Sequence, residues 1–150
     1  MTAAELVTIT KPDDWHLHLR DEIALKTTVP ATSRVFGRAI VMPNLKPPVT
    51  SVKMALNYRS RILEHKTPDS SFNPLMTLFL TDNLDPNEIV SLSNEESVVA
   101  VKYYPAGATT NSDTGVTNIK NVYRVIEKMA ELGVPSVSYT HLTLPTIYSV

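Results

Sequence analysis

The stretch DDWHLHLRD, residues 13–21, is separated by three residues from the end of the apolar run at residues 6–9. Such a short apolar run is typical of a β-strand, and side chains along an extended strand point to alternating faces. His16, His18 and Arg20 are therefore expected to project from one side. Two neutral imidazole nitrogens beside a fixed cation would suit a metal ion with an anionic substrate next to it. Strand histidines can equally be solvated or bonded to backbone, so the pair alone leaves both interpretations open.

The composition is that of a folded globular protein of one domain. The 150-residue chain is 43% apolar and 19% charged, and it carries 14 basic and 15 acidic residues. A net charge near zero gives no electrostatic footprint for nucleic acid and no attraction to anionic membranes. We therefore expect a small-molecule partner.

The chain has no cysteine, which leaves histidine, carboxylate or modified lysine as possible metal ligands. The N-terminal residues 1–5 have no basic start followed by an apolar stretch, and no apolar run approaches the roughly 20 residues of a membrane span. These features predict a cytoplasmic protein.

Short apolar runs alternate with segments of helical periodicity along the chain. The predicted strands are residues 6–9, 38–42, 74–80 and 98–104, and the predicted helices are residues 23–36, 51–65, a short helix after Asp85, and 116–132. Pro30 is expected to interrupt the first helix, because proline lacks the backbone N–H that a helix interior needs. Gly133 is expected to end the last helix, before a fifth strand.

Four strand–helix units in succession predict a parallel sheet with crossover helices, either doubly wound or a barrel. No glycine-rich turn follows the first strand, which argues against a nucleotide-binding fold. In a (β/α)8 barrel the functional residues lie at the carboxyl ends of strands, where His16, His18, Arg20, Asn44 and Lys102 all fall. The positions of these residues therefore favour an α/β barrel over a doubly wound sheet.

Lys102 is unusual because it stands inside an apolar strand, on the same face as Ala100 and Tyr104. Lysine is depleted in strands since its charge must leave the packed surface. Lys102 is either a strand-end lysine that reaches solvent or a neutral amine that faces the site.

Three segments, residues 12–21, 37–44 and 102–112, together resemble the dihydroorotases of the bacterial homodimeric type, which are metal-dependent amidohydrolases. The resemblance extends from about residue 8 to residue 135. It implies that the chain is the N-terminal half of a (β/α)8 barrel of the metal-dependent hydrolase type. It further implies that the whole enzyme interconverts dihydroorotate and N-carbamoyl-L-aspartate in pyrimidine synthesis. It also implies a homodimer.

The resemblance assigns roles to five residues. It implies that His16 and His18 are metal ligands and that Lys102 reacts with carbon dioxide to form a carbamate that bridges two zinc ions. Arg20 and Asn44 match the residues that hold the substrate carboxylate. The implied mechanism is metal-ion catalysis, in which a metal-held hydroxide attacks the ring carbonyl.

Residues 136–150 depart from the family pattern. Tyr139 stands where a further histidine ligand is expected, and the segment resembles the translation of a sequencing-library adapter. We therefore expect residues 1–135 to be barrel and residues 136–150 to be a non-native tail, and we exclude His141 from the site. The second pair of histidine ligands and the aspartate that would act as general acid and base are missing, so the chain alone is expected to be inactive.

Two alternatives remain open at this point. One is a related cyclic amidohydrolase, such as a hydantoinase or an allantoinase, although Arg20 and Asn44 favour a ring that bears a carboxylate. The other is a catalytically silent relative that serves as an assembly partner. The joint presence of His16, His18 and Lys102 argues against the silent relative.

Overall fold

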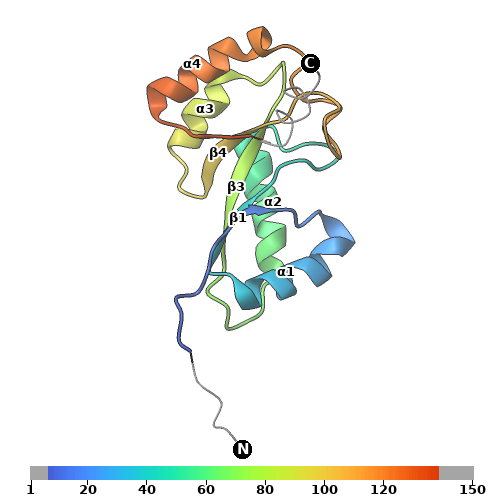
Figure 1. Ribbon diagram of the computed structural model, residues 1–150, viewed down its shortest axis with the longest axis vertical. Helices are drawn as coiled ribbons and strands as arrows, with labels where there is room; N and C mark the ends of the chain where they lie inside the picture. Colours follow the sequence, from blue (N-terminus) through green and yellow to red (C-terminus); the bar gives the residue numbers. More distant parts are fainter. Residues whose placement is uncertain (1–6, 139–150) are drawn as a thin grey trace, which may run out of the picture.

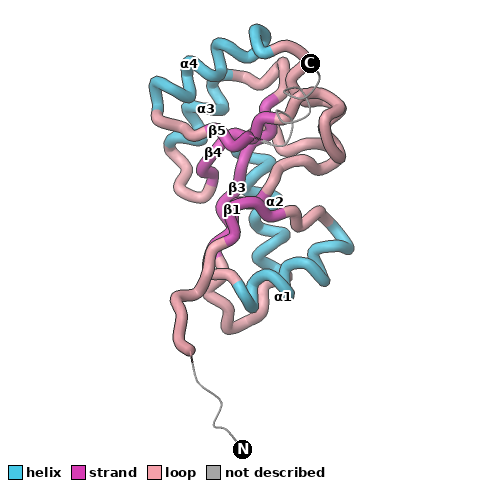
Figure 2. The backbone as a smooth tube through the Cα atoms, viewed as in Figure 1, coloured by secondary structure: helices cyan, strands magenta, loops and turns pink. Residues whose placement is uncertain are grey.

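The computed structural model describes residues 7–138, which form one parallel sheet with helices between the strands (Figure 1). The five strands pair in chain order and are β1 (Asp14–Leu17), β2 (Arg38–Val41), β3 (Asn73–Leu80), β4 (Val98–Tyr103) and β5 (Ser136–Ser138). The helices are α1 (Leu25–Val35), α2 (Val52–Glu64), α3 (Pro86–Ser93) and α4 (Tyr123–Leu132), with short 3-10 helices η1 (Glu22–Ala24) and η2 (Ile119–Val122). Figure 2 shows the strands side by side through the middle of the molecule.

The order of the strands decides between the two predicted architectures. Each strand is parallel to the next one in sequence, from β1 through β5. Parallel crossovers are right-handed, so successive crossovers in one direction leave all the helices on one face of the sheet. A doubly wound sheet instead reverses its strand order where the helices change face. The sheet is therefore part of a barrel, as predicted from the sequence.

The two faces of the sheet have different surroundings. Leu78, Leu80 and Val101 belong to the hydrophobic core, which includes Ile62 of α2 and Ile89 of α3. Phe79 lies between Leu78 and Leu80 in β3, and Lys102 follows Val101 in β4. Phe79 and Lys102 are paired across the two strands and are fully buried, but they are not part of that core. Because side chains alternate along a strand, these two point away from the helices, toward the inside of the curved sheet.

The helix ends confirm several predicted signals. The Ser51 side chain accepts a hydrogen bond from the backbone N–H of Met54 at the start of α2, and Asp85 caps α3 with Pro86 in the first turn. Gly133 ends α4 with a φ of 67°, a left-handed conformation in which glycine has no side-chain clash. The fifth strand then follows, as expected.

The first strand lies later in the sequence than predicted. Residues 7–9 form no strand, and Val7 and Ile9 are about three-quarters exposed. Strand pairing begins only at Asp14, which is opposite Ala39 of β2. The prediction of a strand at residues 6–9 was wrong for residues 7–9, because an apolar pattern makes a strand only where a neighbour can pair with it; Leu6 lies outside the described residues.

Two helices also differ from their predictions. Pro30 lies inside α1, which continues through it. The last helix begins with η2 at Ile119, three residues later than expected, because the backbone of Val116 is used elsewhere. Its N–H donates to the carbonyl of Tyr104 and its carbonyl accepts from the N–H of Ala106.

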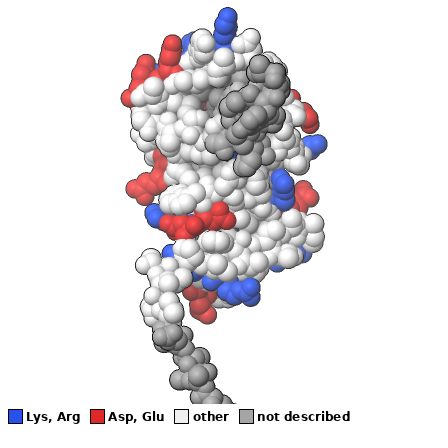
Figure 3. All heavy atoms as spheres, viewed as in Figure 1, with Lys and Arg blue, Asp and Glu red and all other residues white. Residues whose placement is uncertain are grey.

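The surface is consistent with the nearly neutral charge. On the face drawn in Figure 3, acidic and basic side chains are interspersed and form no continuous basic patch. Within residues 7–138, no helix combines the length and the apolar character that crossing a bilayer requires.

We predict that Ile62→Ala lowers the free energy of unfolding by about 2–5 kcal/mol, because it removes buried methyl groups and leaves a cavity. Ile62 is 0% exposed and lies between α2 and the sheet. Ile23→Ala is the matched control, since the Ile23 side chain is 74% exposed. Urea unfolding of both variants measures the difference, and equal losses would contradict this placement of the core.

Candidate active site

The five residues singled out from the sequence lie at one edge of the sheet, at the carboxyl ends of three strands. His16 belongs to β1, and His18 and Arg20 follow its last residue. Asn44 comes three residues after the end of β2, and Lys102 is the penultimate residue of β4. Parallel strands of a barrel present such residues to a common cavity.

The two histidine rings face each other. Their Nε2 atoms are 3.2 Å apart and their ring centroids are 5.1 Å apart. Strand β1 ends at Leu17, so the extended strand expected through Arg20 was wrong beyond that residue. His16 and His18 nevertheless turn the same nitrogen to the same point, which is where a shared cation would lie.

Burial and neighbouring positive charge keep both imidazoles neutral. Burial, with the nearby Lys102 ammonium, lowers the pKa of His16 below its usual value. Burial lowers the pKa of His18 to about 4, with further contributions from Arg20, His16 and Lys102. A neutral imidazole has a free nitrogen lone pair at pH 7, as a metal ligand needs.

Lys102 is fully buried, and its Nζ has no hydrogen-bond partner among residues 7–138. Loss of hydration lowers the pKa of its ammonium group to about 8. A strand-end lysine that reaches solvent is therefore excluded, and a fraction of the amine is neutral near pH 7. Burying an unpaired charge is costly, so this position is unfavourable for packing alone.

Two aromatic side chains surround the lysine. Tyr104 lies with its ring centroid 4.9 Å from the Lys102 Nζ and 5.2 Å from the ring centroid of Phe79. The Tyr104 hydroxyl is buried without a hydrogen-bond partner in the described part of the chain, and burial raises its pKa to about 12. A protonated phenol and an unpaired amine therefore lie next to each other, and both can still bond to a further group.

Asn44 is held by the loop that follows β4. The Asn44 Nδ2 donates to the backbone carbonyl of Thr110 at 2.8 Å, and the backbone carbonyl of Asn44 accepts from the Asn111 Nδ2 at 3.1 Å. Only 2% of Asn44 is exposed. The loop thus contacts Asn44 directly, whereas its polar sequence could be explained equally well by substrate contact or by turn formation.

The ends of this loop are fixed. Tyr104 and Val116 are joined by a backbone hydrogen bond, and Asp82 after β3 accepts from both the backbone N–H and the hydroxyl of Thr117. Gly115 fits because a Cβ there would lie 2.4 Å from the carbonyl oxygen of Tyr104. The loop therefore leaves and re-enters the fold at one place.

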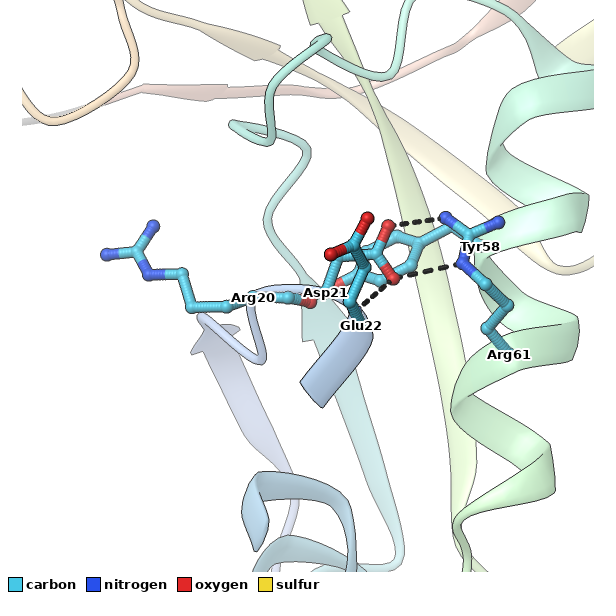
Figure 4. A network of polar contacts seen from close by, with 5 residues as sticks. All are labelled: Arg20, Asp21, Glu22, Tyr58 and Arg61. Atoms are coloured by element: carbon cyan, nitrogen blue, oxygen red, sulfur yellow. Dashed lines mark hydrogen bonds and ion pairs between the residues drawn. The ribbon is translucent and has the colours of Figure 1, made fainter. Parts of the chain in front are cut away.

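Helix α2 holds the backbone beyond the histidines. The Tyr58 hydroxyl donates to the backbone carbonyl of Arg20, and Arg61 forms two hydrogen bonds with the carboxylate of Asp21 (Figure 4). Arg20 and Glu22 have φ values of 62° and 52°. A left-handed conformation costs a non-glycine residue about 1–2 kcal/mol, so this turn persists only where other contacts hold it.

The Asp21–Arg61 pair is charged at neutral pH. Burial raises the pKa of the Asp21 carboxyl, but the hydrogen bonds from Arg61 and from the Glu22 N–H outweigh burial and bring the pKa below its usual value. The same hydrogen bonds raise the pKa of Arg61. Bidentate pairs of this kind fix geometry as well as charge.

Among the described residues, the donors that converge on one point are the two imidazoles of His16 and His18. Within residues 7–138, no group of three or more histidine, aspartate or glutamate side chains is placed to hold an ion. The chain offers two converging imidazoles and, beside them, a buried amine without a partner.

Comparison with known proteins supports this picture. No family model matches the chain. The dihydroorotase of Hahella chejuensis is 61% identical over 127 residues, which are 85% of this chain. The crystal structure of the Campylobacter jejuni dihydroorotase superposes with a TM-score of 0.78 at 38% identity over 86% of the chain. The chain is related to the dihydroorotases.

The relationship covers only part of these enzymes. The chain spans 37% of the length of the Hahella dihydroorotase and 38% of the Campylobacter dihydroorotase chain. An L-hydantoinase from Arthrobacter aurescens also superposes, with a TM-score of 0.66 over 86% of this chain and 29% of its own. Its identity of 15% shows the shared barrel fold alone.

Sequence reasoning missed the contribution of α2. Tyr58 lies three residues after Ala55 and four before Ile62, so it shares their buried helix face. That spacing could have identified it as a buried tyrosine whose hydroxyl needs a partner. The partner itself, a carbonyl in a loop 38 residues away, has no signature in the sequence.

The low pKa of His18 makes stability depend on pH in a defined direction. Unfolded His18 binds a proton near pH 6.5, whereas folded His18 does so near pH 4, so the unfolded state binds more protons in between. We predict that the unfolding free energy of the metal-free chain falls as pH falls from 6.5 to 4. Urea unfolding across this range should show a weaker fall for His18→Gln, and parallel curves would contradict the assignment.

Proposed function

We propose that the whole protein represented by this chain is a dihydroorotase, which reversibly hydrolyses dihydroorotate to N-carbamoyl-L-aspartate in pyrimidine synthesis. The observation that carries the proposal is the fully buried Lys102 amine, without a partner among the described residues, at the same edge as the histidine pair and Arg20. The similarity to dihydroorotases in sequence and fold supports it.

His16, His18 and Lys102 are the residues that would hold the metal, which we propose to be two zinc ions. When bound, the ions would supply a Lewis acid and lower the pKa of a bound water. Lys102 would act as N6-carboxylysine: its neutral amine forms an N–C bond to carbon dioxide and releases one proton, which gives a carbamate of charge −1. The low pKa of Lys102 favours this step, because only the neutral amine is nucleophilic.

Arg20 and Asn44 are proposed to bind the carboxylate of the substrate. The Arg20 guanidinium is exposed at the site and can form two parallel hydrogen bonds to a carboxylate, which adds orientation to charge attraction. The Asn44 Nδ2 carries two N–H groups: one donates to the Thr110 carbonyl, and the other would donate to the carboxylate. A ring that bears a carboxylate therefore fits better than a neutral one.

The rest of the proposed centre lies in the part of the relatives that this chain does not cover. We propose that this part supplies the second pair of histidine ligands and the aspartate that acts as general acid and base. We further propose that the whole protein is a cytoplasmic homodimer and that residues 136–150 are not native. Residues 136–138 form β5, whereas Tyr139 and His141 lie outside the described residues.

The alternatives have less support. A hydantoinase-like activity is disfavoured because the hydantoinase shares only 15% identity, against 38% for the Campylobacter dihydroorotase. A silent assembly partner gives no reason to bury an amine that lacks a partner next to two neutral histidines.

A chimaera tests the function directly. It joins residues 1–135 of this chain to the part of the Hahella dihydroorotase that follows the matched region. We predict that the purified chimaera hydrolyses dihydroorotate, contains zinc by elemental analysis, and shows a carbamate signal in 13C NMR after growth with labelled bicarbonate. Lys102→Ala should lose the carbamate signal and the activity together. A folded, zinc-loaded chimaera without turnover would contradict the proposal.

Substitution of Arg20 tests the substrate class. In the chimaera, Arg20→Ala should raise the KM for dihydroorotate about 10–100-fold, since a charge-assisted hydrogen bond to a carboxylate contributes about 1.5–3 kcal/mol. Arg34→Ala, on the exposed surface of α1, is the control and should leave KM unchanged. An unchanged KM in Arg20→Ala would exclude Arg20 from substrate binding.

A further inference from the structure

The turn at Arg20, Asp21 and Glu22 is held in a conformation that its residues do not favour. Arg20 and Glu22 both have positive φ, and neither is glycine. The flanking backbone is anchored by the Thr28 hydroxyl, which donates to the carbonyls of Leu19 and Ala24. Contacts from outside the turn must therefore determine where Arg20 points.

Those contacts come from one helix, α2. Arg61 donates from Nε to the Asp21 Oδ1 at 2.9 Å and from a terminal nitrogen to Oδ2 at 2.6 Å. The Asp21 Oδ1 also accepts the N–H of Glu22 at 2.9 Å, and the Tyr58 hydroxyl donates to the carbonyl of Arg20. The backbone carbonyl of Arg20 and the carboxylate of Asp21 are thus both fixed to α2.

The Arg20 side chain extends away from these contacts. Figure 4 shows its guanidinium on the opposite side from Tyr58 and Arg61. Within residues 7–138 the guanidinium forms no hydrogen bond or ion pair of its own, whereas Tyr58 is only 1% exposed. The backbone is held firmly on one side while the cation remains available on the other.

Packing alone does not explain the chemistry of the two α2 residues. A phenylalanine would fill the space of the Tyr58 ring, so the buried hydroxyl is accounted for by its bond to the Arg20 carbonyl. The guanidinium of Arg61 lies 5.5 Å from the centroid of the Tyr58 ring, which joins the two side chains into one unit. Both side chains reach the turn from successive levels of the same helix.

We propose that Tyr58 and Arg61 are positioning residues that fix the left-handed turn at Arg20, so that its guanidinium is aligned with the substrate carboxylate. The inference rests on the proposed function of Arg20. Neither residue touches the substrate. Their effect comes through Arg20, because a displacement of about 1 Å in a binding group can cost a large factor in rate or affinity.

The test compares Tyr58→Phe and Arg61→Lys in the chimaera with two controls. Arg59→Lys alters an arginine two residues earlier on α2 that bonds to Asn73 and Pro74 instead, and Tyr123→Phe alters a tyrosine on α4 that is 49% exposed. We expect the two test variants to raise KM about tenfold with kcat changed less than threefold, since carboxylate binding is lost equally in ground and transition states. The controls should change neither constant.

A double-mutant cycle separates positioning from general stability. In the Arg20→Ala background, Tyr58→Phe should raise KM less than twofold, because its effect passes through a side chain that is already absent. An equal increase with and without Arg20 would overturn the proposal. So would a fall in kcat at constant KM, which would indicate only a smaller folded fraction.

Amide hydrogen exchange distinguishes failure of the proposal from failure of the proposed function. It is measured on the same proteins at the amides of Glu22 and Ala24, whose N–H groups bond to Asp21. Tyr58→Phe and Arg61→Lys should accelerate exchange there at least about tenfold, whereas Arg59→Lys should not. If the unsubstituted chimaera has no activity but amide exchange at Glu22 and Ala24 is faster in Tyr58→Phe and Arg61→Lys, the proposed function is wrong and the proposed positioning role is supported. If amide exchange at Glu22 and Ala24 is unchanged in both variants, the proposed positioning role is wrong.

Discussion

Parallel pairing in chain order is the constraint on which the rest of the molecule depends. Because β1 through β5 pair in sequence, every strand ends at the same edge of the sheet. Residues that are distant in sequence, such as His16 and Lys102, thereby become neighbours, and the charge of Lys102 contributes to the lowered pKa of His16. The helices on the other face supply the hydrophobic core, and the inner face carries Lys102 beside Phe79. Stability and chemistry are thus assigned to opposite faces of one sheet.

Lys102 is the residue whose hydration is lost through its place on the inner face of the sheet. A primary amine beside Phe79 and Tyr104 has lost its water without gaining a hydrogen bond from any residue between 7 and 138. In a core position such a residue would be replaced by an apolar one of similar size at little cost. Its presence agrees with the carbamate formation that we propose, because burial lowers the pKa of Lys102 to about 8 and so leaves a fraction of the amine neutral at physiological pH. The same burial keeps both histidines neutral, so one physical cause prepares all three side chains.

The sequence predicted most of the fold because its signals are local. The Asp85-Pro86 start of α3 and the Gly133 end of α4 depend on a few adjacent residues. The position of β1 was wrong because strand formation at residues 7–9 depends on a partner that local pattern cannot reveal. Residues His16, His18, Asn44 and Lys102 could be selected by type and strand position. The contact between Tyr58 and Arg20 could not, since it depends on how α2 lies against a turn 38 residues earlier.

The loop after β4 is closed at its base by the backbone bonds between Tyr104, Ala106 and Val116. These bonds fix the two ends of the loop to each other, whatever the sequence between them. A change in the length of the loop therefore adds little closure entropy and transmits little strain to β4. The loop is thus an insertion that is attached to the sheet at one place. A change within this loop therefore alters the surface next to Asn44, while the strands that carry Lys102 and His16 stay where they are.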